Sequence, residues 1–260
     1  KHIDTAQVYQ NEEGIGNALK SLAVPRNEIY ITTKMWPGMF NQEEPFQTFD
    51  GAIQACNQSL KFLQVDEIDL YLIHNPFAKE NRLELWEAMV ELKKQGKVKH
   101  IGVSNYNVNH IQEIEKAGIE MPAANQIEIH PWHVVSKSLA EYMDKNEILP
   151  IAYSTLAPIP NWREGSRWNG KPEDMKSGAM PCEDIANKYA VTVPQLFLKW
   201  AIQLGYPVLP KSVKYDRLKE NLSLDHFEIS IDDMTSISNI AIDNQKCLAW
   251  SGDFDPLEVD

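Results

Sequence analysis

Short runs of apolar and β-branched residues alternate along the chain with longer stretches whose apolar residues recur at helical spacing. The short runs are apolar on both faces, as parallel strands covered by helices are. They are residues 2–4, 29–34, 68–74, 100–104, 125–129, 149–154 and 208–211. The amphipathic stretches are residues 12–22, 46–63, 83–95, 108–117, 137–146 and 192–204. This alternation predicts a parallel α/β fold, and the absence of a linker predicts a single domain over residues 1–260.

A parallel α/β chain forms either an open doubly wound sheet or a barrel. A doubly wound sheet that binds a dinucleotide normally carries GxGxxG between its first strand and helix. The nearest segment, Gly14-Ile15-Gly16, lacks the third glycine and lies inside a helical pattern. The pattern therefore favours a (β/α)8 TIM barrel. Because the 260 residues hold only seven strand-plus-helix units, we also expect the first βα unit to be absent from the given chain.

Composition and charge narrow the classes of function. Apolar residues make up 43% and charged residues 24%, which excludes a disordered, collagen-like or coiled-coil chain. No run of about 18 uncharged apolar residues is present. The 25 Lys and Arg against 37 Asp and Glu leave a net charge of −12, which repels nucleic-acid backbones and anionic lipid. We expect no nucleic-acid or membrane partner, and a cytoplasmic monomer.

The three cysteines, Cys56, Cys182 and Cys247, are widely spaced and form no CxxC pair. This spacing argues against a disulfide framework and against a zinc site. We therefore expect free thiols and no metal.

Polar or ionisable residues stand at the end of every predicted strand. In a parallel barrel the active site lies at the carboxyl ends of the strands. The residues there are Asp4, Lys34, His74, Ser104, Asn105, Gln126, Glu128, Tyr153, Ser154, Lys211 and Ser212. Each of them alone could be a solvated loop charge or a hydrogen-bonded strand cap, but the whole set indicates a site.

Lys34 ends an apolar strand, so we expect it to be partly buried, with Asp4 on the adjacent strand as its partner. A cation placed there would stabilise the phenolate of Tyr9 and make that hydroxyl a usable acid. His74 ends the next strand, where it could hydrogen-bond a carbonyl oxygen. Together these four residues form a candidate proton-donor relay.

A second cluster holds four cations within nine residues, from Lys211 to Lys219, at a predicted strand-to-helix junction. In an acidic protein such a junction predicts a local anion site, aided by the helix N-terminus. A solvated helix start would explain Lys214 and Lys219 equally well, but it explains Lys211 less well.

Seven motifs together resemble the aldo-keto reductase family, in the family's order and over nearly the whole chain. They are KHIDTAQVYQNE at residues 1–12, TKMW at 33–36, LIHNP at 72–76, GVSNY at 102–106, NQIEIHP at 125–131, AYS at 152–154, and PKS at 210–212 followed by Arg217, Glu220 and Asn221. The resemblance implies a (β/α)8 barrel that reduces an aldehyde or ketone to the alcohol with NADPH.

The resemblance also implies roles for matching residues. Tyr9 would protonate the carbonyl oxygen as hydride arrives from the nicotinamide. Lys34, paired to Asp4, would assist Tyr9, and His74 would orient the carbonyl. The substrate pocket would be lined by the loop at residues 157–181 and by Trp36, His74, Asn75 and Trp250.

For the cofactor, the resemblance implies that Tyr153 stacks on the nicotinamide while Ser104, Asn105 and Gln126 hold its carboxamide. The remaining cofactor residues would be Ser154, Leu156, Lys211, Ser212, Val213, Lys214, Arg217, Glu220 and Asn221. A 2′-phosphate needs cations where a bare ribose does not, so this set favours NADPH over NADH.

Two points qualify the resemblance. Asn75 stands where many relatives have Trp, so we expect a more polar pocket wall. Barrels of this family also serve as cofactor-sensing regulatory subunits of ion channels or other complexes, and these keep the same four residues. The acidic surface and ordinary length favour the enzyme.

Overall fold

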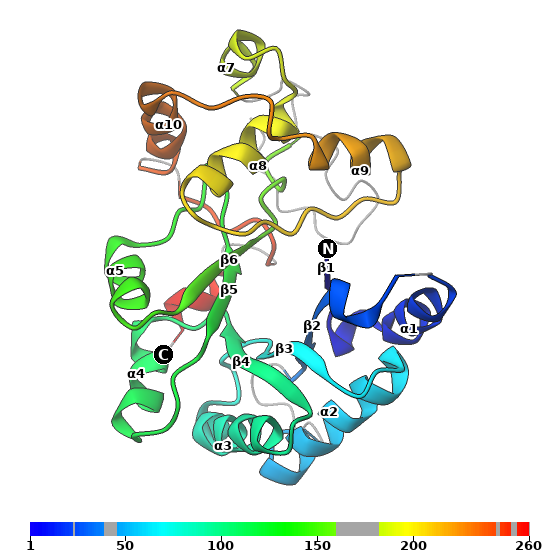
Figure 1. The fold of residues 1–260 in the computed structure, drawn as a ribbon. Helices are drawn as coiled ribbons and strands as arrows, with labels where there is room; N and C mark the ends of the chain where they lie inside the picture. Colours follow the sequence, from blue (N-terminus) through cyan, green and yellow to red (C-terminus); the bar gives the residue numbers. More distant parts are fainter. Residues whose placement is uncertain (23, 39–45, 160–181, 243–244, 251–253, 260) are drawn as a thin grey trace.

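The computed structural model describes residues 1–22, 24–38, 46–159, 182–242, 245–250 and 254–259. Its centre is a six-stranded parallel sheet in which every strand lies beside its neighbours in sequence, in the order β1-β2-β3-β4-β5-β6 (Figure 1). The strands are β1 (His2–Asp4), β2 (Tyr30–Met35), β3 (Ile68–Ile73), β4 (Val98–Ser104), β5 (Ala124–Glu128) and β6 (Leu149–Tyr153). All six residues of β3 are buried, as expected for a strand that is covered on both faces.

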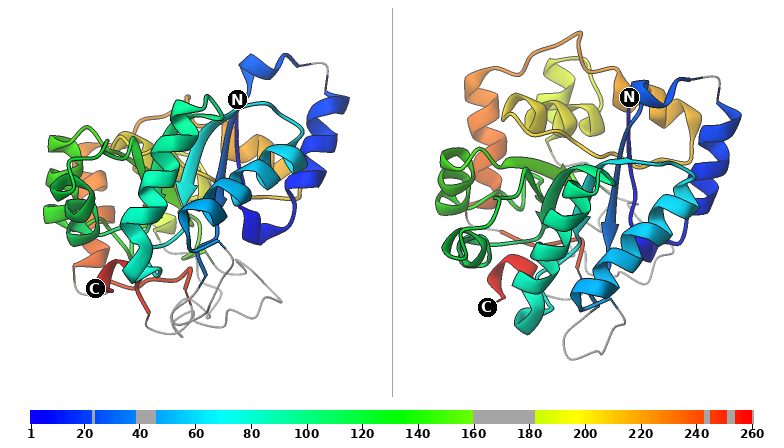
Figure 2. Two further views of the ribbon diagram at one scale, coloured as in Figure 1. Left: turned by 90° about the horizontal axis from the view of Figure 1, so that it is seen from below. Right: turned by 60° about the horizontal axis from the view of Figure 1, so that its bottom comes forward.

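Helices lie around the outside of this sheet, as two further views show (Figure 2). The α-helices are α1 (Glu12–Ser21), α2 (Phe49–Leu63), α3 (Arg82–Lys94), α4 (Val108–Lys116), α5 (Lys137–Lys145), α7 (Glu183–Lys188), α8 (Val193–Gln203), α9 (Tyr215–Leu222) and α10 (Ile231–Ser238). Short 3-10 helices are η1 (Gln7–Tyr9), η2 (Arg26–Glu28), η3 (Lys79–Asn81), η4 (Asn239–Ala241) and η5 (Pro256–Glu258). Within the described residues, none of the helices has the length and apolar character needed to cross a membrane.

Six of the seven predicted strands are confirmed, and the seventh is not. The segment at 208–211 forms only an isolated parallel bridge between Ala152 and Val208. Backbone hydrogen bonds from Ala152 to Pro207 and from Leu209 to Ala152 place it beside β6. Pro207 and Pro210 lack the N–H groups that a longer ladder requires, so pairing stops after one bridge. A closed barrel of eight units stays a prediction.

The six predicted helices are confirmed within a few residues, and one glycine of the first helix, Gly16, has a packing role. A Cβ atom on Gly16 would lie 2.3 Å from the carbonyl oxygen of Phe62, so its missing side chain lets α1 lie directly on the end of α2. Gly14 has nothing within 4 Å of its own Cβ position. Gly16 alone of the two therefore has a role in this helix–helix contact, and both glycines lie inside a helix rather than in a strand-to-helix turn.

The three cysteines are free thiols, which confirms the expectation from their spacing. Cys56 lies fully buried in the main core, whereas Cys182 and Cys247 are partly exposed.

Candidate functional site

The ends of β1 and β2 bring a buried cation and a carboxylate together. The Lys34 ammonium donates hydrogen bonds to Asp4 Oδ1 at 2.5 Å and to the Thr5 carbonyl oxygen at 2.8 Å. Lys34 is 0% exposed, whereas the Asp4 side chain is 13% exposed. A buried ammonium needs such partners, because an unpaired charge is expensive to desolvate. The predicted burial and pairing of Lys34 are therefore confirmed.

Tyr9 and His74 lie beside this ion pair. The Lys34 ammonium nitrogen lies 5.4 Å from the centre of the Tyr9 ring, and the Tyr9 and His74 ring centres are 5.7 Å apart. Burial, together with the nearby charge of Lys34, holds the pKa of His74 well below its usual value, so its imidazole is neutral. Tyr9 is 51% exposed. The structure thus joins a solvent-accessible phenol, a buried cation and a neutral imidazole.

Two tryptophans predicted to face the substrate lie near these groups. The Trp36 and His74 ring centres are 5.2 Å apart, with their planes at 90°. The Trp250 indole N–H donates to the Tyr153 hydroxyl at 2.8 Å, which brings the C-terminal segment to the end of β6. Of the predicted pocket loop at 157–181, only residues 157–159 are described, so most of that prediction lies outside the described residues.

Asn75 is turned into the protein. Its side chain is 1% exposed, donates to the Gly38 carbonyl oxygen at 3.2 Å and accepts from the Phe77 N–H at 3.0 Å. The amide oxygen therefore stabilises the turn after β3, and the amide nitrogen ties that turn to the segment that follows β2. That Asn75 makes the pocket wall more polar and contacts a substrate stays a prediction.

The residues expected to hold the nicotinamide form one hydrogen-bonded chain that reaches the ion pair. The Tyr153 hydroxyl donates to Asn105 Oδ1 at 2.7 Å, and Asn105 Nδ2 donates to Ser104 Oγ at 3.1 Å. Ser104 Oγ in turn donates to the Gln126 carbonyl oxygen at 2.8 Å, and Gln126 Nε2 donates to Asp4 Oδ2 at 2.8 Å. These polar groups lie together and already have hydrogen-bond partners. A carboxamide that binds here would therefore replace one of these hydrogen bonds.

Two residues at strand ends adopt the left-handed backbone region. Asn105 has φ = 64° after β4, and Ser154 has φ = 56° after β6. Residues other than glycine pay a conformational penalty there, and such conformations cluster at functional sites. Ser154 begins a turn that its carbonyl oxygen closes with the Ala157 N–H at 2.8 Å, and Leu156 in that turn packs against the core.

The predicted anion cluster lies at the start of α9. Lys211, Lys214 and Arg217 are exposed, and none of them forms an ion pair with another described residue. Ser212 Oγ accepts a hydrogen bond from the Lys214 N–H at 3.1 Å, and Val213 is 83% exposed between them. Uncompensated cations at a helix N-terminus fit a phosphate group.

The two residues expected on the adenine side differ in their surroundings. The Glu220 carboxylate accepts from the Thr192 hydroxyl at 2.5 Å, so it is already engaged with the start of α8. Asn221 is 7% exposed. Their contact with a cofactor stays a prediction.

Glu128, noted in the sequence only as a polar strand end, holds the C-terminal segment in place. It is 2% exposed, and its carboxylate accepts from the Leu248 N–H at 2.6 Å, the Ala249 N–H at 3.0 Å and the Cys247 thiol at 3.0 Å. Burial alone would raise the pKa of Glu128, but hydrogen bonds from His130 and Cys247 and nearby histidine charge outweigh burial and lower it. No local sequence pattern indicates this role, because the partners lie about 120 residues away.

Comparison with known proteins agrees with this geometry. The profile of the family described as "Aldo/keto reductase family" matches residues 1–242. The glyoxal reductase of Bacillus subtilis (strain 168) is 36% identical over 245 residues, which cover 94% of this chain and 80% of that protein. The crystal structure of MGS-M4, an aldo-keto reductase enzyme from a Medee basin deep-sea metagenome library, is 34% identical with a TM-score of 0.79, covering 97% of this chain and 85% of that one. A Bombyx mori aldo-keto reductase in complex with NADP is 31% identical with a TM-score of 0.75, over 92% of this chain and 78% of that one. The chain belongs to the aldo/keto reductase family, and its fold is that of an α/β barrel.

Proposed function

We propose that this protein reduces a small aldehyde or ketone to the alcohol with NADPH. The observation that carries the proposal is the exposed Tyr9 phenol beside the buried Lys34–Asp4 ion pair and the neutral His74. Family membership supports carbonyl reduction, and the glyoxal reductase among the relatives supports a small aldehyde as substrate.

NADPH, when bound, supplies the hydride. Neutral His74 can donate an N–H to the carbonyl oxygen and orient it. Tyr9 then gives its hydroxyl proton to the oxygen that gains negative charge, and the Lys34 cation stabilises the phenolate left behind. Because Tyr9 is 51% exposed, solvent can return the proton.

The residues present fit the cofactor. Ser104, Asn105, Gln126 and Tyr153 are already linked at the strand ends, next to the ion pair. The exposed cations at the start of α9 would bind the 2′-phosphate, which distinguishes NADPH from NADH. The complex of the silkworm relative with NADP supports this choice.

Replacing Tyr9 with Phe tests the proton donor. We expect turnover of glyoxal-type aldehydes to fall on the order of 10²–10⁴-fold, because the general acid is lost. NADPH binding, followed by cofactor fluorescence, should stay nearly unchanged. Tyr30→Phe, a partly exposed tyrosine at the start of β2, is the matched control and should keep full activity. Wild-type turnover in Tyr9→Phe would overturn the mechanism.

Neutralising two cations tests the phosphate site. Lys211→Ala combined with Arg217→Ala should weaken NADPH binding at least about tenfold per cation, because charge-assisted hydrogen bonds contribute about 1.5–3 kcal/mol each. NADH binding should change little. Lys116→Ala with Lys145→Ala removes the same charge from exposed positions elsewhere and should leave both affinities unchanged. An equal loss for NADPH and NADH in the first variant would refute the assignment.

The alternative of a cofactor-sensing regulatory subunit makes a different prediction for the unaltered protein, namely that it binds NADPH without turning over any carbonyl. The same turnover assay therefore decides between the two. That the protein is cytoplasmic and monomeric stays a prediction. Sedimentation of the purified protein tests whether it is a monomer.

A further inference from the structure

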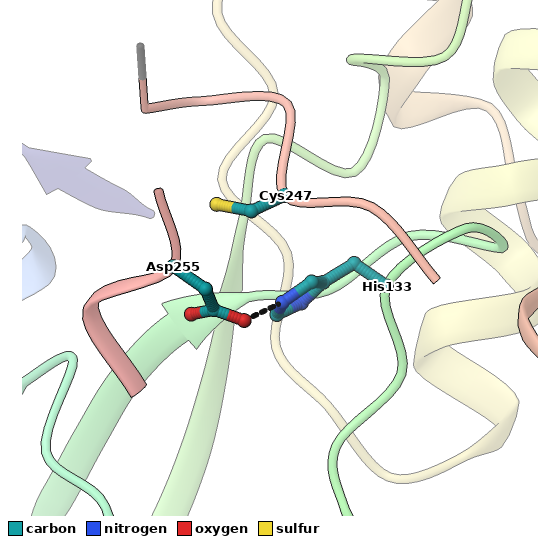
Figure 3. Close-up of side chains that lie close together, drawn as sticks. All are labelled: His133, Cys247 and Asp255. Atoms are coloured by element: carbon teal, nitrogen blue, oxygen red, sulfur yellow. Dashed lines mark hydrogen bonds and ion pairs between the residues drawn. The ribbon is translucent and has the colours of Figure 1, made fainter. Parts of the chain in front are cut away.

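Three potential metal ligands meet at the end of β5, outside the reductase site (Figure 3). His133 lies in the segment after β5, and Cys247 and Asp255 lie in the C-terminal segment. The imidazole nitrogen, the thiol sulfur and a carboxylate oxygen all lie within 4.8 Å of one another. The cysteines form no CxxC pair, so their spacing predicts no metal site; here the fold brings together ligands that lie more than 100 residues apart in the sequence.

The His133 ring is held in the orientation that a metal ligand requires. Its Nδ1 lies 2.9 Å from the Glu128 carbonyl oxygen, which can only accept, so Nδ1 carries a proton. The other nitrogen, Nε2, faces Asp255 Oδ2 at 2.7 Å. Histidines that bind metals typically donate their second ring N–H to a carbonyl or carboxylate in this way.

Hydrogen bonds with neighbouring groups also position the other two ligands. Asp255 Oδ1 accepts the Leu257 N–H at 2.9 Å, which leaves Oδ2 directed at the histidine. The Cys247 sulfur lies 3.0 Å from Glu128 Oε2, which accepts the thiol hydrogen. Two carboxylates therefore lie around one thiol and one imidazole, an arrangement whose negative charge favours a bound cation.

We propose that His133, Cys247 and Asp255 bind one divalent transition-metal ion of the zinc class. A nitrogen, a sulfur and an oxygen ligand suit Zn²⁺, whereas Ca²⁺ and Mg²⁺ require mainly oxygen ligands. The ion replaces two protons, one on His133 Nε2 and one on the Cys247 sulfur, so the net charge of the cluster is unchanged.

The site needs only small movements to close around an ion. Tetrahedral zinc with ordinary bond lengths separates its ligand atoms by roughly 3.3–3.6 Å. The His133–Asp255 pair, at 2.7 Å, must therefore open by less than about 1 Å, and the Cys247 sulfur, within 4.8 Å of both, needs to approach by no more than about 1.5 Å. Asp255 and Cys247 are partly exposed, which gives the ion access to the site.

The position of the site suggests what a bound ion does. Cys247 and Asp255 stand on either side of Trp250 in the sequence, and Trp250 donates to the Tyr153 hydroxyl. An ion that joins both residues to His133 fastens the C-terminal segment to the end of the sheet and holds Trp250 beside Tyr153.

Cobalt titration of the untagged protein tests the site. One equivalent of Co²⁺ should produce a thiolate-to-cobalt charge-transfer band in the near ultraviolet, and Zn²⁺ should displace it. Cys247→Ser should abolish the band, whereas Cys182→Ser, which removes the other partly exposed thiol, should keep it. Asp255→Asn removes a charged ligand and should weaken Co²⁺ binding by at least the roughly 10–100-fold that loss of a ligand's hydrogen-bond partner costs. A band that persists in Cys247→Ser, or no band in the wild type, would overturn the proposal.

A measurement on the unaltered protein covers the case in which a variant does not fold. X-ray absorption at the zinc edge, with one equivalent of Zn²⁺ bound, should show one sulfur ligand at about 2.3 Å together with nitrogen and oxygen ligands. A spectrum with nitrogen and oxygen ligands alone would place the ion at exposed histidines instead and refute the site.

Discussion

Replacing Asp69 with Asn should destabilise the barrel, and the effect should disappear in acid. Asp69 lies in β3, where its side chain is 7% exposed. Its carboxylate accepts from Arg26 at 2.7 Å, from Lys99 at 2.7 Å and from the Ile31 N–H of β2 at 2.9 Å. One carboxylate thus joins β2, β3 and β4 and the 3-10 helix that precedes β2.

The expected loss follows from these contacts. A hydrogen bond to a charged group contributes about 1.5–3 kcal/mol, whereas an exposed ion pair contributes at most about 1 kcal/mol. Arg26 is 35% exposed and Lys99 is 45% exposed, so each of the two ion pairs contributes about 1 kcal/mol or less. Since Asn can still accept one bond, we expect the free energy of unfolding to fall by about 2 kcal/mol. For a protein of this size that lowers Tm by about 4–8 °C.

The pH dependence follows from the pKa of Asp69. Burial alone would raise this pKa, but hydrogen bonds from Lys99, the Ile31 N–H and Arg26 outweigh burial and lower it. A carboxyl group whose pKa is lower in the folded state contributes stability above its unfolded pKa of about 3.9. That contribution is lost as the pH falls through the folded pKa. The difference between wild type and Asp69→Asn should therefore be full above about pH 5 and shrink below about pH 4.

Urea unfolding at a series of pH values measures this difference. Asp66→Asn is the control, because Asp66 is an exposed carboxylate three residues earlier and its replacement should change stability by less than about 0.5 kcal/mol. If the two variants were equally stable at neutral pH, or if the Asp69 difference did not depend on pH, the reasoning would be wrong.

Two further replacements probe packing and ion pairing. Gly102→Ala in β4 places a Cβ atom 2.6 Å from the Ala124 carbonyl oxygen and should lower the free energy of unfolding by about 1–3 kcal/mol, whereas Gly14→Ala, with open space around it, should not be destabilising. Arg82→Lys loses the two-pronged bond to Glu113, at 2.8 and 2.5 Å, and should cost about 1–3 kcal/mol in urea unfolding. An unchanged midpoint in either destabilising variant would contradict the packing or pairing described.

Much of the fold could be predicted from the sequence because it depends on local periodicity. Apolar runs with both faces buried predict strands, and apolar spacing near 3.6 predicts helices, so six strands and six helices were located within a few residues. The Lys34–Asp4 pair could be predicted for the same reason. Both residues end neighbouring parallel strands, whose carboxyl ends lie side by side.

Other features depend on how the chain runs between distant elements. Residues 208–211 have a strand-like composition, yet pairing beside β6 stops at one bridge, because prolines interrupt the backbone donors. Asn75 stands at a strand end like the other polar residues, but its amide hydrogen-bonds Phe77 in the turn that follows and Gly38 in the segment after β2.

By itself, the sequence determined the alternation of strands and helices, the polar residues at the strand ends and the pairing of Lys34 with Asp4. Tertiary structure alone decided that Glu128 binds the segment at 247–249 and that His133 meets Cys247 and Asp255. The physical reason is that periodicity reports which face of an element is buried. Contacts across more than 100 residues depend instead on the path of the C-terminal segment over the end of the sheet, which no local pattern encodes.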